Sequence, residues 1–232
     1  MAGMTSLLLL LWAGATMSMW VDLQKRIIGG ETCKKDERRY HVKLLDKSGA
    51  FLCGGSLISN QWILTAAHCH PVEKAVVGVH PKPKIQLKKV KPKDIAKAVM
   101  YDDRDDNNND RIHDIMLLKL RDPVTGITPV RLPDCGNKPN VKDVVQIAGH
   151  AATAPDAHGK KGLILTYEKV FCAKRDKVDT CPGDSGGGVL FNGMIYGVHV
   201  VSGKYACARH MTYMDVCKFK DWIHDITGVT FP

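Results

Sequence analysis

Residues 183–201 read GDSGGGVLFNGMIYGVHVV, and this stretch decides the fold. Its later part contains two apolar, β-branched runs, residues 188–191 and 194–201, with Asn192-Gly193 between them. An Asn-Gly pair between two such runs is a strong signal for a two-residue β-hairpin turn. Its earlier part places glycines on both sides of Ser185, and these glycines allow the backbone to turn sharply. The stretch therefore predicts a glycine-rich turn followed by a hairpin.

The same pattern of short apolar runs and turn signals extends toward the N-terminus. Further strands are predicted at residues 40–45, 56–58, 62–65, 75–79, 115–120 and 144–148. Many short strands with few helical stretches are typical of an all-β sandwich or barrel. The sequence shows no internal repeat and no alternation of strands with helices.

One helix and one linker complete this plan. Apolar residues recur at a spacing of three to four near the C-terminus, at Val216, Phe219, Trp222, Ile223 and Ile226. Asp215 is a suitable N-cap and Gly228 a suitable stop, which predicts a helix at residues 215–227. Residues 121–133 contain three prolines and are interpreted as an extended linker between two halves.

Length, composition and cysteine content favour a secreted protein. The chain has 232 residues, 44% of them hydrophobic, and eight cysteines without any C-x-x-C pair. A disulfide framework in an oxidising compartment fits this spacing better than a metal or redox motif. The apolar run at residues 7–13 is followed by small residues and is too short to span a bilayer. We expect residues 1–18 to be a secretory signal peptide.

Charge is distributed unevenly along the chain, which carries 33 basic and 24 acidic residues and a formal net charge of +9. Lysines crowd residues 82–93, and aspartates and asparagines crowd the stretch that follows. The acidic stretch, residues 102–111, is interpreted as a solvated loop. The lysine-rich loop is either a solvated face or a site for an acidic ligand.

Ser185 is a candidate nucleophile. A serine hydroxyl attacks well only when it is exposed, positioned and next to a base. The flanking glycines allow close approach of a substrate, and they leave the backbone N–H groups of Gly183 and Ser185 available to an oxyanion. The alternative is an ordinary glycine-rich turn.

His68 and Asp114 are the candidate partners of this serine. His68 ends a run of small residues, and its neighbour Cys69 could pin the loop by pairing with Cys53. Asp114 stands just ahead of an apolar strand, where a buried carboxylate is costly unless it is hydrogen-bonded. A histidine N–H would supply that bond and fix the tautomer. His113 is a competing base that we rank below His68.

The chain order His, Asp, Ser, with GDSGG around the serine and AAHC around the histidine, resembles the trypsin family of serine proteases. The resemblance implies two antiparallel β-barrels, the first at about residues 27–125 and the second at about residues 135–214. It implies that Ser185 attacks the scissile carbonyl, that His68 takes and returns the proton, and that Asp114 orients His68.

Residues 25–30, KRIIGG, resemble the activation site of the family's zymogens. Cleavage after Arg26 by an activating protease would create a new α-amino group on Ile27. By resemblance, that ammonium pairs with Asp184 and orders the oxyanion hole and the specificity pocket. Residues 19–26 would then be an activation peptide and residues 27–232 the protease domain.

The specificity pocket implied by the resemblance departs from the family pattern. Asp179 stands at the pocket floor and implies cleavage after Lys or Arg. Val200, Val201 and Ser202 replace a Ser-Trp-Gly wall, and Met211 replaces a glycine. A methionine at this position could fill the pocket and shield Asp179.

The cysteines also depart from the family pattern. The resemblance implies the pairs Cys53–Cys69, Cys135–Cys217 and Cys181–Cys207. Cys33 and Cys172 remain without their usual partners, because only 23 positions (172 − 149) separate Gly149 from Cys172 where the family has a longer stretch. Three alternatives are open for these two cysteines: they pair with each other, stay free or bridge two chains. We therefore expect a shortened second barrel.

Two hypotheses about function follow. The first is a secreted serine endopeptidase with protein or peptide substrates, without cofactor or metal and without nucleic-acid or membrane partners. Calcium is not expected, because lysines occupy the loop where the family often carries calcium-binding carboxylates. The second is a catalytically impaired homologue that acts as a secreted binding protein.

Overall fold

The computed structural model describes residues 33–34, 37–79, 92–102, 113–149, 169–173, 184–201 and 211–232. The strands are β1 (His41–Leu45), β2 (Phe51–Leu57), β3 (Trp62–Thr65), β4 (Lys74–Val77), β5 (Lys93–Met100), β6 (Met116–Leu120), β7 (Gln146–Ile147), β8 (Val170–Ala173), β9 (Gly188–Phe191), β10 (Met194–Val201) and β11 (Met211–Asp215). The helical segments are two 3₁₀ helices, η1 (Ala67–Cys69) and η2 (Val216–Phe219), and the α-helix α1 (Lys220–Thr227). The expected all-β class with a C-terminal helix is confirmed.

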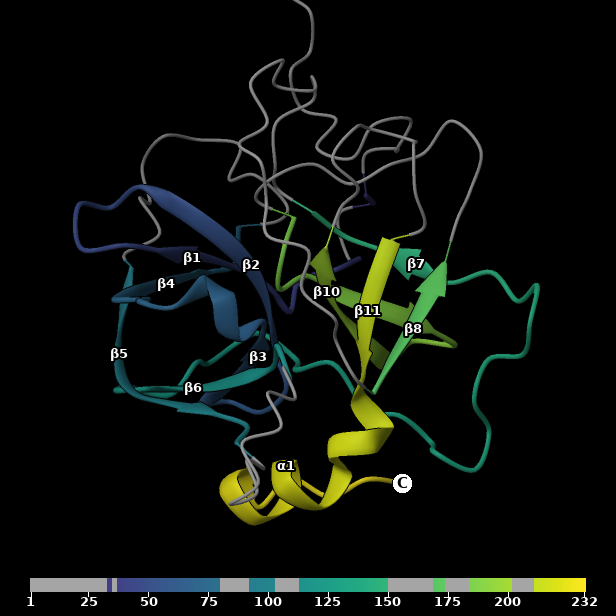
Figure 1. Ribbon diagram of the computed structural model, residues 1–232. Coiled ribbons are helices and arrows are strands. Elements are labelled where there is room, and N and C mark those ends of the chain that lie inside the picture. Colours follow the sequence, from purple (N-terminus) through teal and green to yellow (C-terminus); the bar gives the residue numbers. More distant parts are fainter. Residues whose placement is uncertain are drawn as a thin grey trace, which may run out of the picture.

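The first half is a closed antiparallel barrel with the strand order β1-β2-β3-β6-β5-β4 (Figure 1). Every residue of β3 is buried, and β6 is buried except for Lys119. Close packing explains why β2 contains glycines, since a Cβ on Gly55 would lie 2.8 Å from Ile63 Cγ2. The barrel interior is therefore filled by side chains and serves as a rigid support for the segments at its rim.

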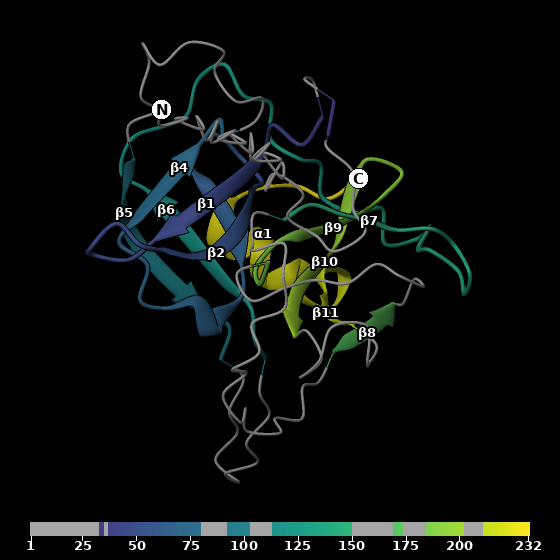
Figure 2. The ribbon, with the colours of Figure 1, turned by 90° about the horizontal axis from the view of Figure 1, so that it is seen from above.

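The second half is described as a five-stranded antiparallel sheet with the order β7-β9-β10-β11-β8. The predicted hairpin joins β9 to β10. Asn192 has φ 48° and Gly193 has φ 73°, as a type I′ turn requires. Seen from above, the barrel and this sheet lie side by side (Figure 2).

Residues 121–133 connect the two halves without forming a strand, as the prolines predicted. The linker is held to the barrel where the Val130 N–H donates to the Leu57 carbonyl at 2.9 Å. It is held to the sheet where the Ile195 N–H donates to the Arg131 carbonyl at 3.0 Å. The linker therefore holds the two halves together as well as joining them.

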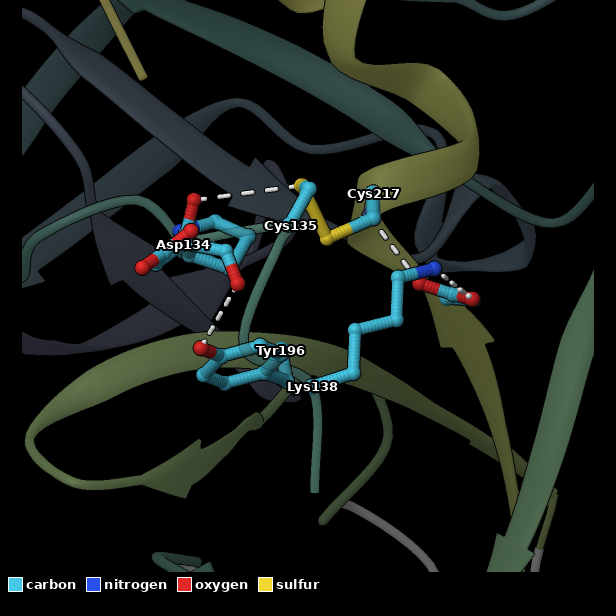
Figure 3. Close-up of polar contacts among 7 residues, drawn as sticks. Asp134, Cys135, Lys138, Tyr196 and Cys217 are labelled. Atoms are coloured by element: carbon cyan, nitrogen blue, oxygen red, sulfur yellow. Dashed lines mark hydrogen bonds and ion pairs between the residues drawn. A yellow bond between two sulfur atoms is a disulfide. The ribbon is translucent and has the colours of Figure 1, made fainter. Parts of the chain in front are cut away.

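The C-terminal segment is fixed at its start by the disulfide Cys135–Cys217 (Figure 3). Beside it, the Tyr196 hydroxyl donates to the Asp134 carbonyl at 2.9 Å. The Asp215 carboxylate accepts the Cys217 N–H at 3.0 Å, and this cap begins η2. Gly228, with φ 70°, ends α1 as expected. The helix predicted at residues 215–227 differs at its start, because Asp215 ends β11 and the first turn is the 3₁₀ helix η2, so that α1 begins only at Lys220. In the part of the chain that the structure describes, no helix is long and apolar enough to cross a membrane.

Candidate active site

His68 and Asp114 are joined by two hydrogen bonds. The backbone N–H of His68 donates to Asp114 Oδ1 at 2.7 Å, and His68 Nδ1 lies 2.6 Å from Asp114 Oδ2. The Asp114 side chain is 3% exposed, whereas that of His68 is 41% exposed. A carboxylate on Nδ1 holds the proton there and leaves Nε2 as the basic nitrogen. This arrangement suits a general base whose working nitrogen faces solvent or substrate.

A disulfide fixes the segment that carries His68. Cys53 in β2 is bonded to Cys69 in η1, with their Cα atoms 6.0 Å apart. These two cysteines and His68 also place ligand atoms within 4.8 Å of one another, which could suggest a metal site. Both sulfur atoms are bonded to each other, however, so they offer no thiolate to a metal. We therefore assign no metal to this cluster.

Ser185 lies in the turn between Asp184 and β9, and main-chain hydrogen bonds hold that turn on two sides. On the barrel side, the Gly54 N–H donates to the Ser185 carbonyl at 2.8 Å. On the sheet side, the Gly186 N–H donates to the carbonyl of His199, which lies in β10, at 2.7 Å. The His199 N–H in turn donates to the Gly187 carbonyl at 2.9 Å. The turn is thus fixed between the two halves.

Close packing places this turn against the segment that leads to His68. Gly186 has φ 77°, and a Cβ there would lie 2.2 Å from Thr65 Oγ1 and 2.4 Å from the Gly54 carbonyl oxygen. The same Cβ would lie 3.3 Å from the nitrogen of Ala66, two residues before His68. Within the described ranges, no hydrogen bond joins Ser185 to His68. Such bonds are often long in ligand-free enzymes and tighten when substrate binds.

Asp184 is fully buried, and its carboxylate packs against the backbone of Gly149. A Cβ on Gly149 would lie 1.8 Å from Asp184 Oδ1, so only glycine fits there. A buried carboxylate is tolerated only with hydrogen-bonding or charged partners. The expected partner, Ile27, lies outside the described residues.

Several other predicted site residues also lie outside the described residues. These are Arg26, Asp179, Gly183, Ser202 and the cysteines of the implied pair Cys181–Cys207. Met211 is described and lies in β11, where it is 4% exposed and packs in a small cluster with Val189 and Tyr213. Cys33 and Cys172 are free thiols, and Cys172 is exposed.

Comparison with known proteins identifies the family. The family model for trypsin matches residues 27–223. The chain belongs to the trypsin family. It is 34% identical to snake venom serine protease KN13 of Trimeresurus stejnegeri over 86% of each chain. It is 32% identical to anionic trypsin of Canis lupus familiaris over 95% of this chain and 97% of that one.

The fold agrees with this assignment to the trypsin family. The structure of mouse neuropsin, a serine protease expressed in the limbic system of the brain, superposes with a TM-score of 0.65 at 24% identity. The match covers 84% of this chain and 96% of neuropsin. As a member of this family the chain is a serine-type endopeptidase, and its substrates are proteins or peptides.

His199 is a residue of this region that the sequence reasoning missed. Its side chain is fully buried. Burial lowers the pKa of His199 to about 3, and repulsion from His68 adds to this effect, while Asp114 and the backbone of Thr212 oppose it. The only signal in the sequence was a histidine inside an otherwise apolar run, which is more often a packed core residue than a functional one.

Proposed function

We propose that His68, Asp114 and Ser185 form the catalytic triad of this endopeptidase. The observation that carries the proposal is the pair of hydrogen bonds from His68 to the buried Asp114 carboxylate, at 2.7 and 2.6 Å. The turn that bears Ser185 packs against the segment leading to His68, which supports its role as the nucleophile. A nucleophile, a base and a residue that orients the base are the parts that acyl transfer requires.

The proposed reaction begins when the Ser185 hydroxyl attacks the scissile carbonyl and transfers its proton to His68 Nε2. The Oγ–C bond forms, and the carbonyl oxygen becomes an oxyanion held by the N–H groups of Gly183 and Ser185. His68 then protonates the departing amine as the C–N bond breaks. A water molecule releases the acyl group by the same steps, again with His68 as the base. Asp114 stabilises the imidazolium formed in both halves.

We propose further that the enzyme is secreted and made as a zymogen. Cleavage after Arg26 would free the Ile27 ammonium to pair with Asp184, and the complete burial of Asp184 beside Gly149 supports a site closed to water. A desolvated ion pair of this kind switches a segment only when both charges are present. We propose that Asp179 gives a preference for Lys or Arg and that Met211 limits access to it.

The decisive experiment is labelling with a fluorophosphonate probe, which reacts only with an activated serine. The precursor is cleaved after Arg26, and labelling is compared before and after cleavage. Ser185→Ala serves as the control, because it removes the nucleophile and keeps the fold. We expect labelling that requires both the cleavage and Ser185.

Two other results would change the assignment. Equal labelling of the uncleaved precursor would refute the zymogen switch but not the triad. A folded, cleaved protein that does not label would refute the triad, and the chain would then be an impaired homologue that acts by binding.

A further inference from the structure

His199 holds the turn of the nucleophile through its backbone. Its carbonyl accepts the Gly186 N–H at 2.7 Å, and its N–H donates to the Gly187 carbonyl at 2.9 Å. These two glycines directly follow Ser185. The position of Ser185 therefore depends on where the backbone of β10 lies at His199.

The strand is irregular at this point. His199 pairs with Tyr213 of β11, but the next pair joins Val201 to Thr212, so a bulge interrupts the ladder between them. A bulge leaves backbone groups without their regular ladder partners. The imidazole of His199 hydrogen-bonds to the backbone of Thr212. Its ring also packs against the ring of Tyr213, with centroids 5.3 Å apart. The side chain thus links β10 to β11 where the ladder is broken.

We propose that His199 is a positioning residue of the protease: its imidazole bridges the bulge and fixes the β10 backbone that holds Gly186 and Gly187 behind Ser185. This inference rests on the proposed role of Ser185 as the nucleophile. His199 touches no reacting atom, so its effect on catalysis is indirect.

The surroundings of the ring keep it neutral. The charged groups that act on it are His68 of η1, which opposes its protonation, and Asp114 ahead of β6, which favours it. From β11 it faces the backbone of Thr212 and the ring of Tyr213. Burial outweighs the favourable contacts and lowers the pKa of His199 to about 3. A neutral imidazole can donate one hydrogen bond without bringing a second positive charge near His68.

The test compares His199→Leu, which has no donor, with His199→Gln, which carries a neutral amide donor on a side chain of similar reach. The control is Tyr196→Phe. Tyr196 lies on the same strand, and its hydroxyl lies 2.9 Å from the Asp134 carbonyl (Figure 3) and 2.9 Å from the Asn137 carbonyl. Tyr196→Phe therefore removes partly buried hydrogen bonds from β10 and none of those that hold the turn of Ser185.

We expect His199→Leu to lower kcat on a peptide substrate by about 10- to 100-fold, the range for a small misplacement of a reacting group, with KM within about twofold. His199→Gln should restore kcat to within about threefold of the wild type, and Tyr196→Phe should leave kcat unchanged. If His199 had only a structural role, kcat would instead fall in each of the three variants in proportion to that variant's loss of stability.

A second readout separates this proposal from the triad itself. Hydrogen exchange of the amides of Gly186 and of residue 199, which form the two hydrogen bonds between the turn and β10, should be at least about tenfold faster in His199→Leu, but not in His199→Gln, whether or not Ser185 reacts. If His199→Leu does not fold, His199→Phe replaces it, since it keeps a ring and lacks a donor. Unchanged kcat and unchanged exchange in the donor-free variant would overturn the proposal. Failure of the wild type to label would refute the triad alone.

Discussion

The two disulfides in the described part of the chain should contribute to stability and to activity in opposite order. Cys53 and Cys69 are 16 positions apart, and Cys135 and Cys217 are 82 apart. The entropy of closing loops of these lengths in the unfolded chain gives about 3 kcal/mol for the shorter and about 4.5 kcal/mol for the longer. Removing the second disulfide should therefore lower the free energy of unfolding by about 1.5 kcal/mol more than removing the first.

Activity should respond in the reverse order, because the shorter loop, from Cys53 to Cys69, contains both His68 and Gly54. The Cys53–Cys69 bridge ties β2, whose Gly54 holds the Ser185 carbonyl, to η1, which carries His68. The other bridge lies beside Asp134 and Tyr196, at the entry to the C-terminal segment (Figure 3). Loosening the first should move the triad, and loosening the second should not.

The assay pairs urea unfolding with the rate of fluorophosphonate labelling, measured on the double variants C53A/C69A and C135A/C217A after activation. We expect labelling to fall at least about tenfold in the first and to stay within about twofold in the second. A larger stability loss in C53A/C69A would refute the loop-entropy argument. Equal losses of labelling would refute the claim that the Cys53–Cys69 bridge positions the triad.

Four shorter predictions address single residues. Asp114→Asn should lower kcat by about 10⁴-fold, the value known for the family's triad, with little change in KM in steady-state assays. Gly186→Ala should abolish labelling and lower the thermal midpoint, because its Cβ would lie 2.4 Å from the Gly54 carbonyl oxygen at φ 77°; a variant that still labels would refute this packing. Burial lowers the pKa of His199 to about 3 in the folded protein, from its ordinary value of 6.5. Between these two pH values the unfolded chain binds more protons than the folded chain, so the free energy of unfolding falls as the pH falls. Because His199→Gln removes this titration, urea unfolding of the variant should lose about 3 kcal/mol less stability between pH 7 and pH 4 than that of the wild type. Met211→Gly should raise kcat/KM for Lys and Arg substrates at least about tenfold if this side chain limits the pocket; lower stability without any gain would show that Met211 is only a core residue.

The strands that the sequence predicted are those whose own residues are apolar or β-branched, such as β3, β6 and the β9–β10 hairpin. The strands it missed take their stability from their neighbours. β5 contains no fully buried residue and includes Lys93 and Lys97, yet it pairs with both β4 and β6. β2 was predicted only at residues 56–58 because glycines weaken strand propensity. A closed barrel supplies the missing pairing energy, which local patterns do not contain.

The active-site motifs were recognisable because each needs particular residues at particular positions. In the proposed triad histidine, aspartate and serine carry the chemistry, and Gly186 allows backbone contacts that a larger residue would prevent. The groups that hold these motifs in place leave a weaker trace. Gly54 contacts the Ser185 turn through its backbone N–H. His199 contacts the turn through its backbone, and its imidazole forms a hydrogen bond with the backbone of Thr212. Main-chain contacts of this kind depend on tertiary packing, so they cannot be read from residue types.

If the stretch before Cys172 is shortened, as we expect from the sequence, the consequences should differ between the proposed substrate pocket and the proposed nucleophile. β7 and β8, which flank this stretch in the sequence, form the two edges of the described sheet. The hydrogen bonds that hold the Ser185 turn come instead from Gly54 in β2 and His199 in β10, which lie in the barrel and at the centre of the sheet. A change confined to the edges can alter the pocket that we propose beside Met211, because β11 pairs directly with β8. It need not displace the nucleophile, so we expect the loss of this stretch to affect which substrates bind more than whether Ser185 reacts.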